Sequence, residues 1–380
     1  MNPLRALAFL VGIAVIVGTT SSVLRNLVVP RRLRSRLTRI VGRAVGAPFR
    51  VLAYRSTVYE TRDGLLAWSA PLAIIVILVT WLLLYMVGYG LLIYAISDLG
   101  WTTALRESGS SVFTLGFAST DRGRLTTVDF AAAITGPIVI GLQVGYLPAL
   151  YGAYNRRESE VTMLDSRAGE PNWGPEILAR HSSVSSLDNL SELYRGWERW
   201  AADVSESHSN YPVLIYFRSQ QASRSWLIGL LSVLDSAALT LAFNPSGRRG
   251  EARMALRMGF VCLRDLAKTL GIPYDDDPSP DDPITLSYDE FMVGVERMQR
   301  ADYPMERTPA EAWPHFRGWR VNYESIAYSL AGMIDAVPAP WSGPRRGSPA
   351  LMLPRTPLNR QPGGASGSPA GPTAAEPEDG

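Results

Sequence analysis

Three stretches in the first half of the chain carry no charged side chain. A helix of about 20 apolar residues spans the hydrocarbon core of a bilayer, so each stretch is long enough, or nearly so, to cross a membrane. Continuous apolar runs of this length are typical of transmembrane helices. The pattern therefore predicts an all-α membrane protein with spans at Ala6–Leu24, Leu65–Ile96 and Phe130–Tyr154.

Residues 1–24 also allow a second interpretation, a secretory signal peptide. Such a peptide carries a basic n-region and a cleavage site between small residues. Here Arg5 is the only basic residue before the apolar run, and no clear cleavage site follows it. We expect a retained N-terminal transmembrane helix, with a cleaved signal as the alternative.

The linker between the first two spans, residues 25–64, is strongly basic. Within it, residues 25–62 contain ten arginines and one acid, Glu60. Basic segments beside a membrane helix stay on the cytoplasmic side. Apolar residues recur at helical spacing among the arginines, which predicts an amphipathic segment on the inner leaflet with anionic lipid at Arg31–Arg62. A solvated run of charge is the alternative.

Charge orients the remaining segments as well. Residues 97–129 carry four acids against three arginines, whereas Arg156 and Arg157 directly follow the last span. This bias predicts an outer N-terminus, an outer segment 97–129 and a cytoplasmic C-terminal half in a multi-pass plasma-membrane protein. Lys268 is the only lysine, which we interpret as the GC-rich coding bias of a bacterial gene.

The outer segment has the lengths of a loop that enters the membrane and returns. Trp101–Val112 would descend about 18 Å as a helix. Thr114–Ala118 would climb about 16 Å as extended chain. Non-helical backbone at that depth is tolerated only where it is buried in protein or lines a water-filled cavity. An ordinary outer loop is the alternative.

Residues 110–118 read Ser-Ser-Val-Phe-Thr-Leu-Gly-Phe-Ala. An apolar piece ending in Thr-Leu-Gly-Phe between two membrane helices resembles the pore loop of the bacterial two-transmembrane potassium channels. Their usual filter is Thr-Val-Gly-Tyr-Gly. The resemblance implies a pore domain at 65–155, a pore loop at 101–119 and a homotetramer. It also implies that main-chain carbonyls replace the hydration shell of a permeant monovalent cation, potassium by analogy. The implied filter residues are Thr114, Leu115, Gly116, Phe117 and Ala118.

Two positions depart from the pattern of that superfamily. Ala118 stands in place of the second glycine, and Ser119 stands where many members have aspartate. Alanine adopts a positive φ only with strain, so a deformed outer site is expected. A weakly selective cation pore and a closed, non-conducting one are therefore alternatives to a potassium-selective pore.

The last span contains residues that allow a helix to bend. The resemblance implies an inner-helix hinge or gate in this span. Ordinary helix packing through small residues is the alternative. The candidate hinge residues are Gly136, Gly141, Gly145 and Pro148.

The second half of the chain has the pattern of a helical soluble domain, residues 172–342. Trp226–Phe243 has Asp235 as its only charged residue, and we expect it to be the buried central helix, with a fourth span as the alternative. A central aspartate makes membrane insertion costly, by about 2.5–3.5 kcal/mol. Residues 343–380 are rich in Pro, Gly, Ser and Ala, which predicts a disordered tail. Capping boxes at Ser287 with Glu290 and at Thr308 with Glu311 predict two further helix starts.

The composition argues against nucleic-acid binding and against a metal site. The net charge of +2 gives no field that favours nucleic acid, and a single cysteine with three widely spaced histidines gives no metal motif. We expect no enzyme and no cofactor apart from the permeant ion. The expected function is a tetrameric cation channel regulated by the cytoplasmic domain. The alternative is a non-conducting membrane scaffold or sensor that keeps the pore-loop shape.

Overall fold

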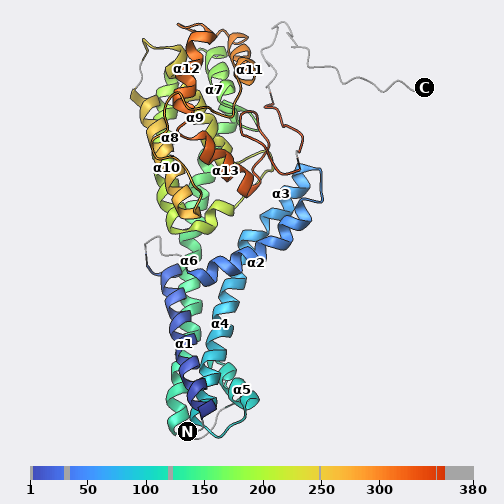
Figure 1. The fold of residues 1–380 in the computed structure, drawn as a ribbon, viewed down its shortest axis with the longest axis vertical. Coiled ribbons are helices and arrows are strands. Elements are labelled where there is room, and N and C mark those ends of the chain that lie inside the picture. Colours follow the sequence, from blue (N-terminus) through green and yellow to red (C-terminus); the bar gives the residue numbers. More distant parts are fainter. Residues whose placement is uncertain (1–2, 30–34, 119–122, 248–249, 348, 356–380) are drawn as a thin grey trace, which may run out of the picture.

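The computed structural model describes residues 3–29, 35–118, 123–247, 250–347 and 349–355. Over these residues every regular element is a helix. Figure 1 shows an elongated molecule with two parts, which we call the stem and the head. The stem contains α1 (Pro3–Leu27), α4 (Ser69–Ile96), α5 (Trp101–Val112) and the first part of α6 (Gly123–Ala168). In the described chain, four helical segments are long and apolar enough to span a membrane, and three of them are in or extend from the stem.

The N-terminal helix packs closely on α4. A Cβ added to Gly12 would lie 2.9 Å from the carbonyl oxygen of Gly88, so the two backbones meet where neither residue has a side chain. Trp81 Nε1 donates a hydrogen bond to Ser22 Oγ at 3.0 Å. Small residues and polar side-chain bonds are the usual means by which helices associate in lipid. The contact makes α1 an integral part of the stem.

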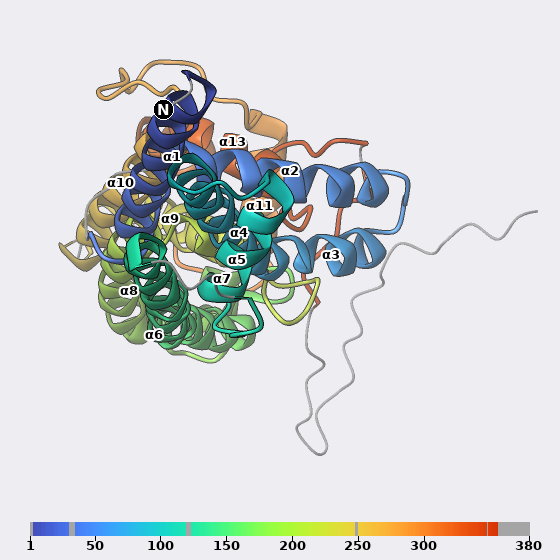
Figure 2. The ribbon, with the colours of Figure 1, turned by 90° about the horizontal axis from the view of Figure 1, so that it is seen from below.

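The basic linker forms two helices at the junction of stem and head, α2 (Arg36–Ala53) and α3 (Tyr59–Ala67). Figure 2, seen from the stem end, shows both helices projecting to one side of the bundle. The expected amphipathic character of this segment is present in α2, where the arginines lie on one face and most apolar residues lie on the opposite face. Residues 30–34, including the first arginines of the predicted lipid-binding stretch, lie outside the described residues.

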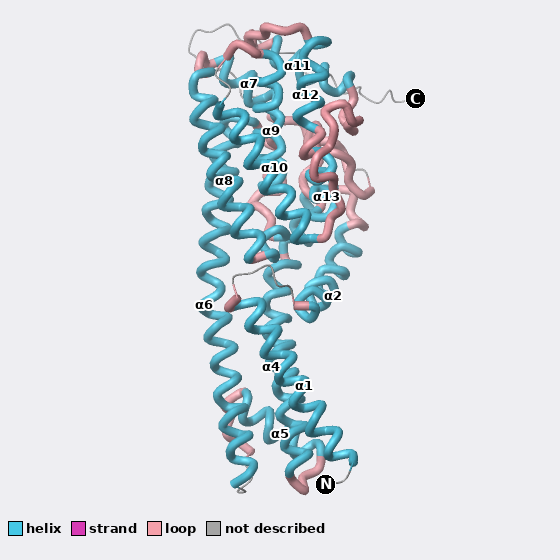
Figure 3. Tube along the Cα trace, turned by 60° about the vertical axis from the view of Figure 1, so that its left-hand side comes forward, coloured by secondary structure: helices cyan, strands magenta, loops and turns pink. Residues whose placement is uncertain are grey.

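Helix α6 joins the stem to the head without a break. It continues through Pro137 and Pro148, beyond the expected end of the span at residue 154, and ends at Ala168. Figure 3 shows it as one long helix along both parts. Val161 and Leu164 of its final turns belong to the head's hydrophobic core. The head therefore begins before residue 172, and α6 connects it to the stem as one continuous helix.

The head is built around α9 (Trp226–Phe243). Of its residues, 94% are buried inside the chain, which agrees with the prediction of a buried central helix. Asp235 is balanced there by Arg320, whose own side chain is fully buried. Both predicted capping boxes are present and start α11 (Tyr288–Gln299) and α12 (Pro309–Arg320). The helices around α9 are the final turns of α6, α7 (Gly174–Ser183), α8 (Leu190–Asn210), α10 (Gly250–Leu270), α12 and α13 (Glu324–Ile334).

The expected disordered tail differs from the structure over its first part. Residues 343–347 and 349–355 pack against the head, and Arg345 is buried with its guanidinium donating to the carbonyls of Ala336 and Val337. Arg180 donates to the carbonyl of Arg355 at 2.6 Å. A segment poor in apolar residues is ordered here because arginines satisfy its backbone carbonyls. Residues 356–380 lie outside the described residues.

Candidate functional site: the hairpin between α4 and α6

Helix α5 has the predicted bounds and runs back along α4. Its first residue, Trp101, makes an edge-to-face ring contact with Tyr94 at 6.3 Å. Two turns later, Ser108 Oγ donates to the carbonyl of Met86 at 2.7 Å. The partners on α4 move from residue 94 to residue 86, so α5 retraces about 12 Å of the stem. The chain therefore turns inward after leaving α4.

The inner end of α5 lies against α6. Val112, its last residue, is 1% exposed. A Cβ added to Gly136 would lie only 1.9 Å from the carbonyl oxygen of Val112. The two backbones can approach this closely only because Gly136 has no side chain. The position of the hairpin depends on this contact.

The chain reverses directly after α5. Leu115 N–H donates to the carbonyl of Ser110 at 2.8 Å, and Thr114 N–H donates to the carbonyl of Ser111 at 3.0 Å. This bond pair is the Schellman arrangement, which requires a left-handed residue after the helix. Thr114 occupies that position with φ 54°, and Gly116 follows with φ 69°. A β-branched residue in this conformation is strained, so the turn is held by its surroundings.

The returning arm climbs beside the same helix. Ala118 N–H donates to Ser110 Oγ at 3.1 Å. The guanidinium of Arg106 lies 5.3 Å from the centre of the Phe117 ring. The segment from Trp101 to Ala118 is therefore a hairpin of one helix and one non-helical arm. Ser119, the last residue of the predicted pore loop, lies outside the described residues.

Apolar side chains of the turn are exposed in a single chain. Leu115 is 62% exposed, Phe117 is 55% exposed and Phe113 is 37% exposed. Exposed apolar residues of this size, side by side, mark a surface that contacts another molecule or lipid.

The four candidate hinge residues are not brought together. Gly136 is buried against Val112, whereas a Cβ at Gly141 or Gly145 would meet nothing within 4 Å. Gly141, Gly145 and Pro148 share an exposed face of α6. In this structure α6 is one helix through all four positions, and bending at them stays a prediction.

Two acidic residues behind the hairpin were not singled out from the sequence. Asp129 of α6 accepts a hydrogen bond from Ser111 Oγ at 2.9 Å. Glu107 of α5 is 2% exposed. They could have been recognised in the sequence as acidic residues in helices that are otherwise expected to lie in the membrane. The bond between Ser111 and Asp129 ties the helical arm of the hairpin to α6.

The described part of the chain has no group of His, Cys, Asp and Glu side chains that could hold a metal ion. No known protein family, curated protein or solved structure matches the chain. Its function is therefore inferred from the geometry of the hairpin.

Proposed function

We propose that four copies of the chain form a cation channel whose ion path is lined by the main chain of Thr114–Phe117. The observation that carries the proposal is the hairpin: α5 retraces α4 and ends in a non-helical turn inside the stem. Backbone of this kind at membrane depth must be covered by protein or line a water-filled cavity. One chain leaves the turn exposed, so further copies have to enclose it.

The backbone of the turn supports carbonyl coordination of a cation. Thr114 and Gly116 have positive φ, and Leu115 between them does not. Alternation of the sign of φ allows consecutive carbonyl groups to face the same side of the chain. Rings of such carbonyls replace the hydration shell of a permeating ion. The partial negative charge at the C-terminal end of α5 favours a cation at the same place.

The proposed ion is monovalent, with potassium as the first candidate. The hydroxyl of Thr114 would lie at the inner end of the path. Ala118, in place of a glycine, affects only the outermost site, since it belongs to the returning arm beside Ser110. The head would regulate the pore through α6, which enters both parts without interruption.

The arrangement of the elements along the molecule supports the topology that we propose from charge. The N-terminus and the hairpin lie at one end of the molecule, and the basic α2 and the head lie toward the other (Figure 1). We place the hairpin end outside a bacterial plasma membrane and the head in the cytoplasm.

Native mass spectrometry and a liposome flux assay on the purified full-length protein test the proposal. We expect a four-chain assembly and a potassium-dependent flux through reconstituted vesicles. A monomer, or a tetramer without flux, would contradict a channel. The latter result would favour the non-conducting scaffold.

A further inference from the structure

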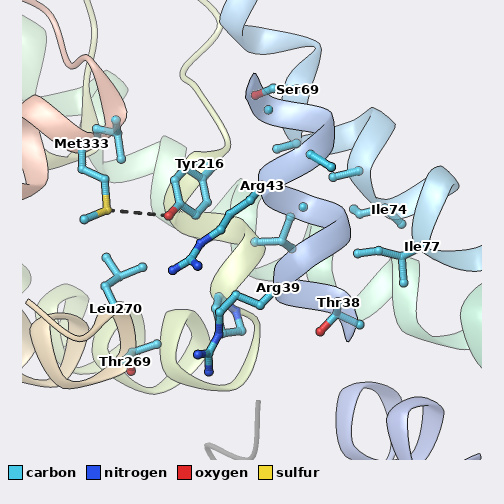
Figure 4. Close-up of a pocket in the computed structure, with 18 of the residues that line it drawn as sticks. Thr38, Arg39, Arg43, Ser69, Ile74, Ile77, Tyr216, Thr269, Leu270 and Met333 are labelled. Carbon is cyan, nitrogen blue, oxygen red and sulfur yellow. Dashed lines mark hydrogen bonds between the residues drawn. The ribbon is translucent and has the colours of Figure 1, made fainter. Parts of the chain in front are cut away.

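A cavity of about 1100 Å³ lies where the stem meets the head. Its walls come from α2 and the first turns of α4 on one side, and from the ends of α10 and α13 on the other. Figure 4 shows Arg39 and Arg43 extending from α2 into this space, toward Tyr216, Thr269 and Leu270. The cavity therefore has one wall from the membrane part and one from the head.

Cationic side chains without acidic partners line this cavity. Arg39, Arg43 and Arg50 lie on one face of α2, and Lys268 faces them from α10. Over the described residues, none of these four takes part in an ion pair or a side-chain hydrogen bond. Uncompensated cations converging from two elements favour an anionic ligand.

Arg25 of α1 adds a fifth cation to the lining, and the two remaining charged groups, Asp335 and Arg218, are already paired. Asp335 accepts from Arg62 Nη2 at 2.9 Å, and Arg218 forms an ion pair with Asp63. Asp335 is the one acid among the described lining residues, so the cavity keeps an excess of positive charge.

One wall of the cavity is apolar and leads toward the bilayer. It consists of Ala70, Ala73, Ile74 and Ile77, all in the first turns of α4. The same helix continues as a candidate membrane span. A ligand with a charged head and an apolar chain would place each part against matching residues.

We propose that this cavity binds the phosphate headgroup of an anionic phospholipid. Arg39, Arg43 and Lys268 would donate to its phosphate oxygens, and an acyl chain would lie along Ile74 and Ile77. Arginine is the side chain that best matches phosphate geometry. The ligand would connect α2 of the stem to α10 of the head. This site does not depend on conduction by the hairpin.

The single lysine of the chain gives a direct probe of the cavity. Lys268 is exposed, and apart from the N-terminus it is the only primary amine. We would measure its acetylation rate in the full-length protein by mass spectrometry. The protein would be held in nanodiscs of phosphatidylcholine alone or with added phosphatidylglycerol. We expect phosphatidylglycerol to slow acetylation about threefold, the factor expected when lipid is at about twice its Kd.

Two double variants distinguish binding of the phospholipid in the cavity from non-specific attraction of anionic lipid to the basic segment. Arg39→Gln with Arg43→Gln removes two charges inside the cavity and should abolish the protection. Arg36→Gln with Arg55→Gln removes two charges from the same segment outside the cavity and should retain it. Equal protection in both double variants, or equal loss, would overturn the proposal, as would equal rates for the unmodified protein in the two nanodiscs.

A soluble phosphate ester is the alternative ligand for this cavity, because it carries the same phosphate group. Glycerol 3-phosphate added to phosphatidylcholine nanodiscs supplies the headgroup without acyl chains. We expect no protection of Lys268 at millimolar concentration. Protection there without an effect of phosphatidylglycerol would overturn the lipid assignment.

Discussion

Gly136 of α6 lies directly against the carbonyl group of Val112, the last residue of α5. A methyl group at Gly136 would lie 1.9 Å from that oxygen, so one of the two helices would have to move. The contact fixes how deeply the hairpin enters the stem. It also gives Gly136 a packing role that is separate from bending.

We therefore expect Gly136→Ala to displace α5 and to destabilise the protein by about 1–3 kcal/mol, the usual cost of overpacking. Gly141→Ala is the matched control, because a Cβ there meets nothing within 4 Å. The control should be neutral or slightly stabilising, since alanine favours a helix more than glycine does. Thermal melting in detergent, followed by tryptophan fluorescence, measures both. Equal melting curves would contradict the role assigned to Gly136.

The crossing of α1 and α4 gives a second prediction. Gly12→Leu would drive a side chain into Gly88 and Leu91, which lie within about 3 Å of the added Cβ. The variant should melt at a lower temperature and expose α1 to proteolysis. Gly18→Leu, on the same helix but in open space, should behave as the unmodified protein does. A Gly12→Leu variant with unchanged melting would show that α1 does not pack on α4.

The buried charges of the head give a third prediction. Arg320 lies between Asp235 and Glu324 and is fully buried. Arg320→Leu leaves these acids uncompensated and should cost about 3–5 kcal/mol. Arg300→Leu breaks the exposed ion pair with Glu296 and should cost less than about 1 kcal/mol. Chemical denaturation measures the free energy of unfolding of both variants. Similar losses would mean that the buried ion pairs of Arg320 do not stabilise the head more than an exposed pair does.

His208 makes stability depend on pH. Burial, followed by the positive charge of Arg157, lowers the pKa of His208 well below 6.5. Its Nε2 faces Arg157 Nη1 at 3.0 Å and acts as the acceptor. The unfolded chain takes up a proton that the folded chain excludes, so stability is retained above pH 6.5 and lost as the pH falls below it. The loss should approach about 1.4 kcal/mol per pH unit until the folded pKa is reached.

His208→Gln isolates this effect from other titrating groups. Glutamine can accept from Arg157 and does not titrate. The difference in melting temperature between unmodified protein and variant should stay constant from pH 7 to about pH 6.5 and change as the pH falls from there to pH 5. A constant difference over that range would show that His208 does not contribute to the pH dependence.

Local patterns in the sequence were enough to predict the individual helices. The charge-free runs, the bounds of α5 and the capping boxes at Ser287 and Thr308 depend on neighbouring residues only, and the structure contains each of them. The buried position of α9 was predictable because Asp235 is costly in lipid. Its partner, Arg320, is 85 residues away, and sequence spacing gives no signal for such a pair.

Features that join distant segments could not be predicted. The contact of Gly136 with Val112 and the cavity between α2 and α10 both depend on how helices pack in three dimensions. The order of residues 343–347 was missed because composition does not show that Arg345 satisfies the carbonyls of its own segment. Helix α6 likewise continues past the expected end of the span at Tyr154, because Val161 and Leu164 of its final turns pack in the core of the head.

The most direct test of the proposed ion path is the current carried by two glycine variants in planar bilayers. Gly116 has φ 69°, which an alanine adopts only with strain, whereas Gly123 has open space and no such requirement. We predict that the unmodified protein carries a potassium current, that Gly116→Ala abolishes it and that Gly123→Ala leaves it intact. A current unaffected by Gly116→Ala would mean that ions do not pass along the main chain of Thr114–Phe117.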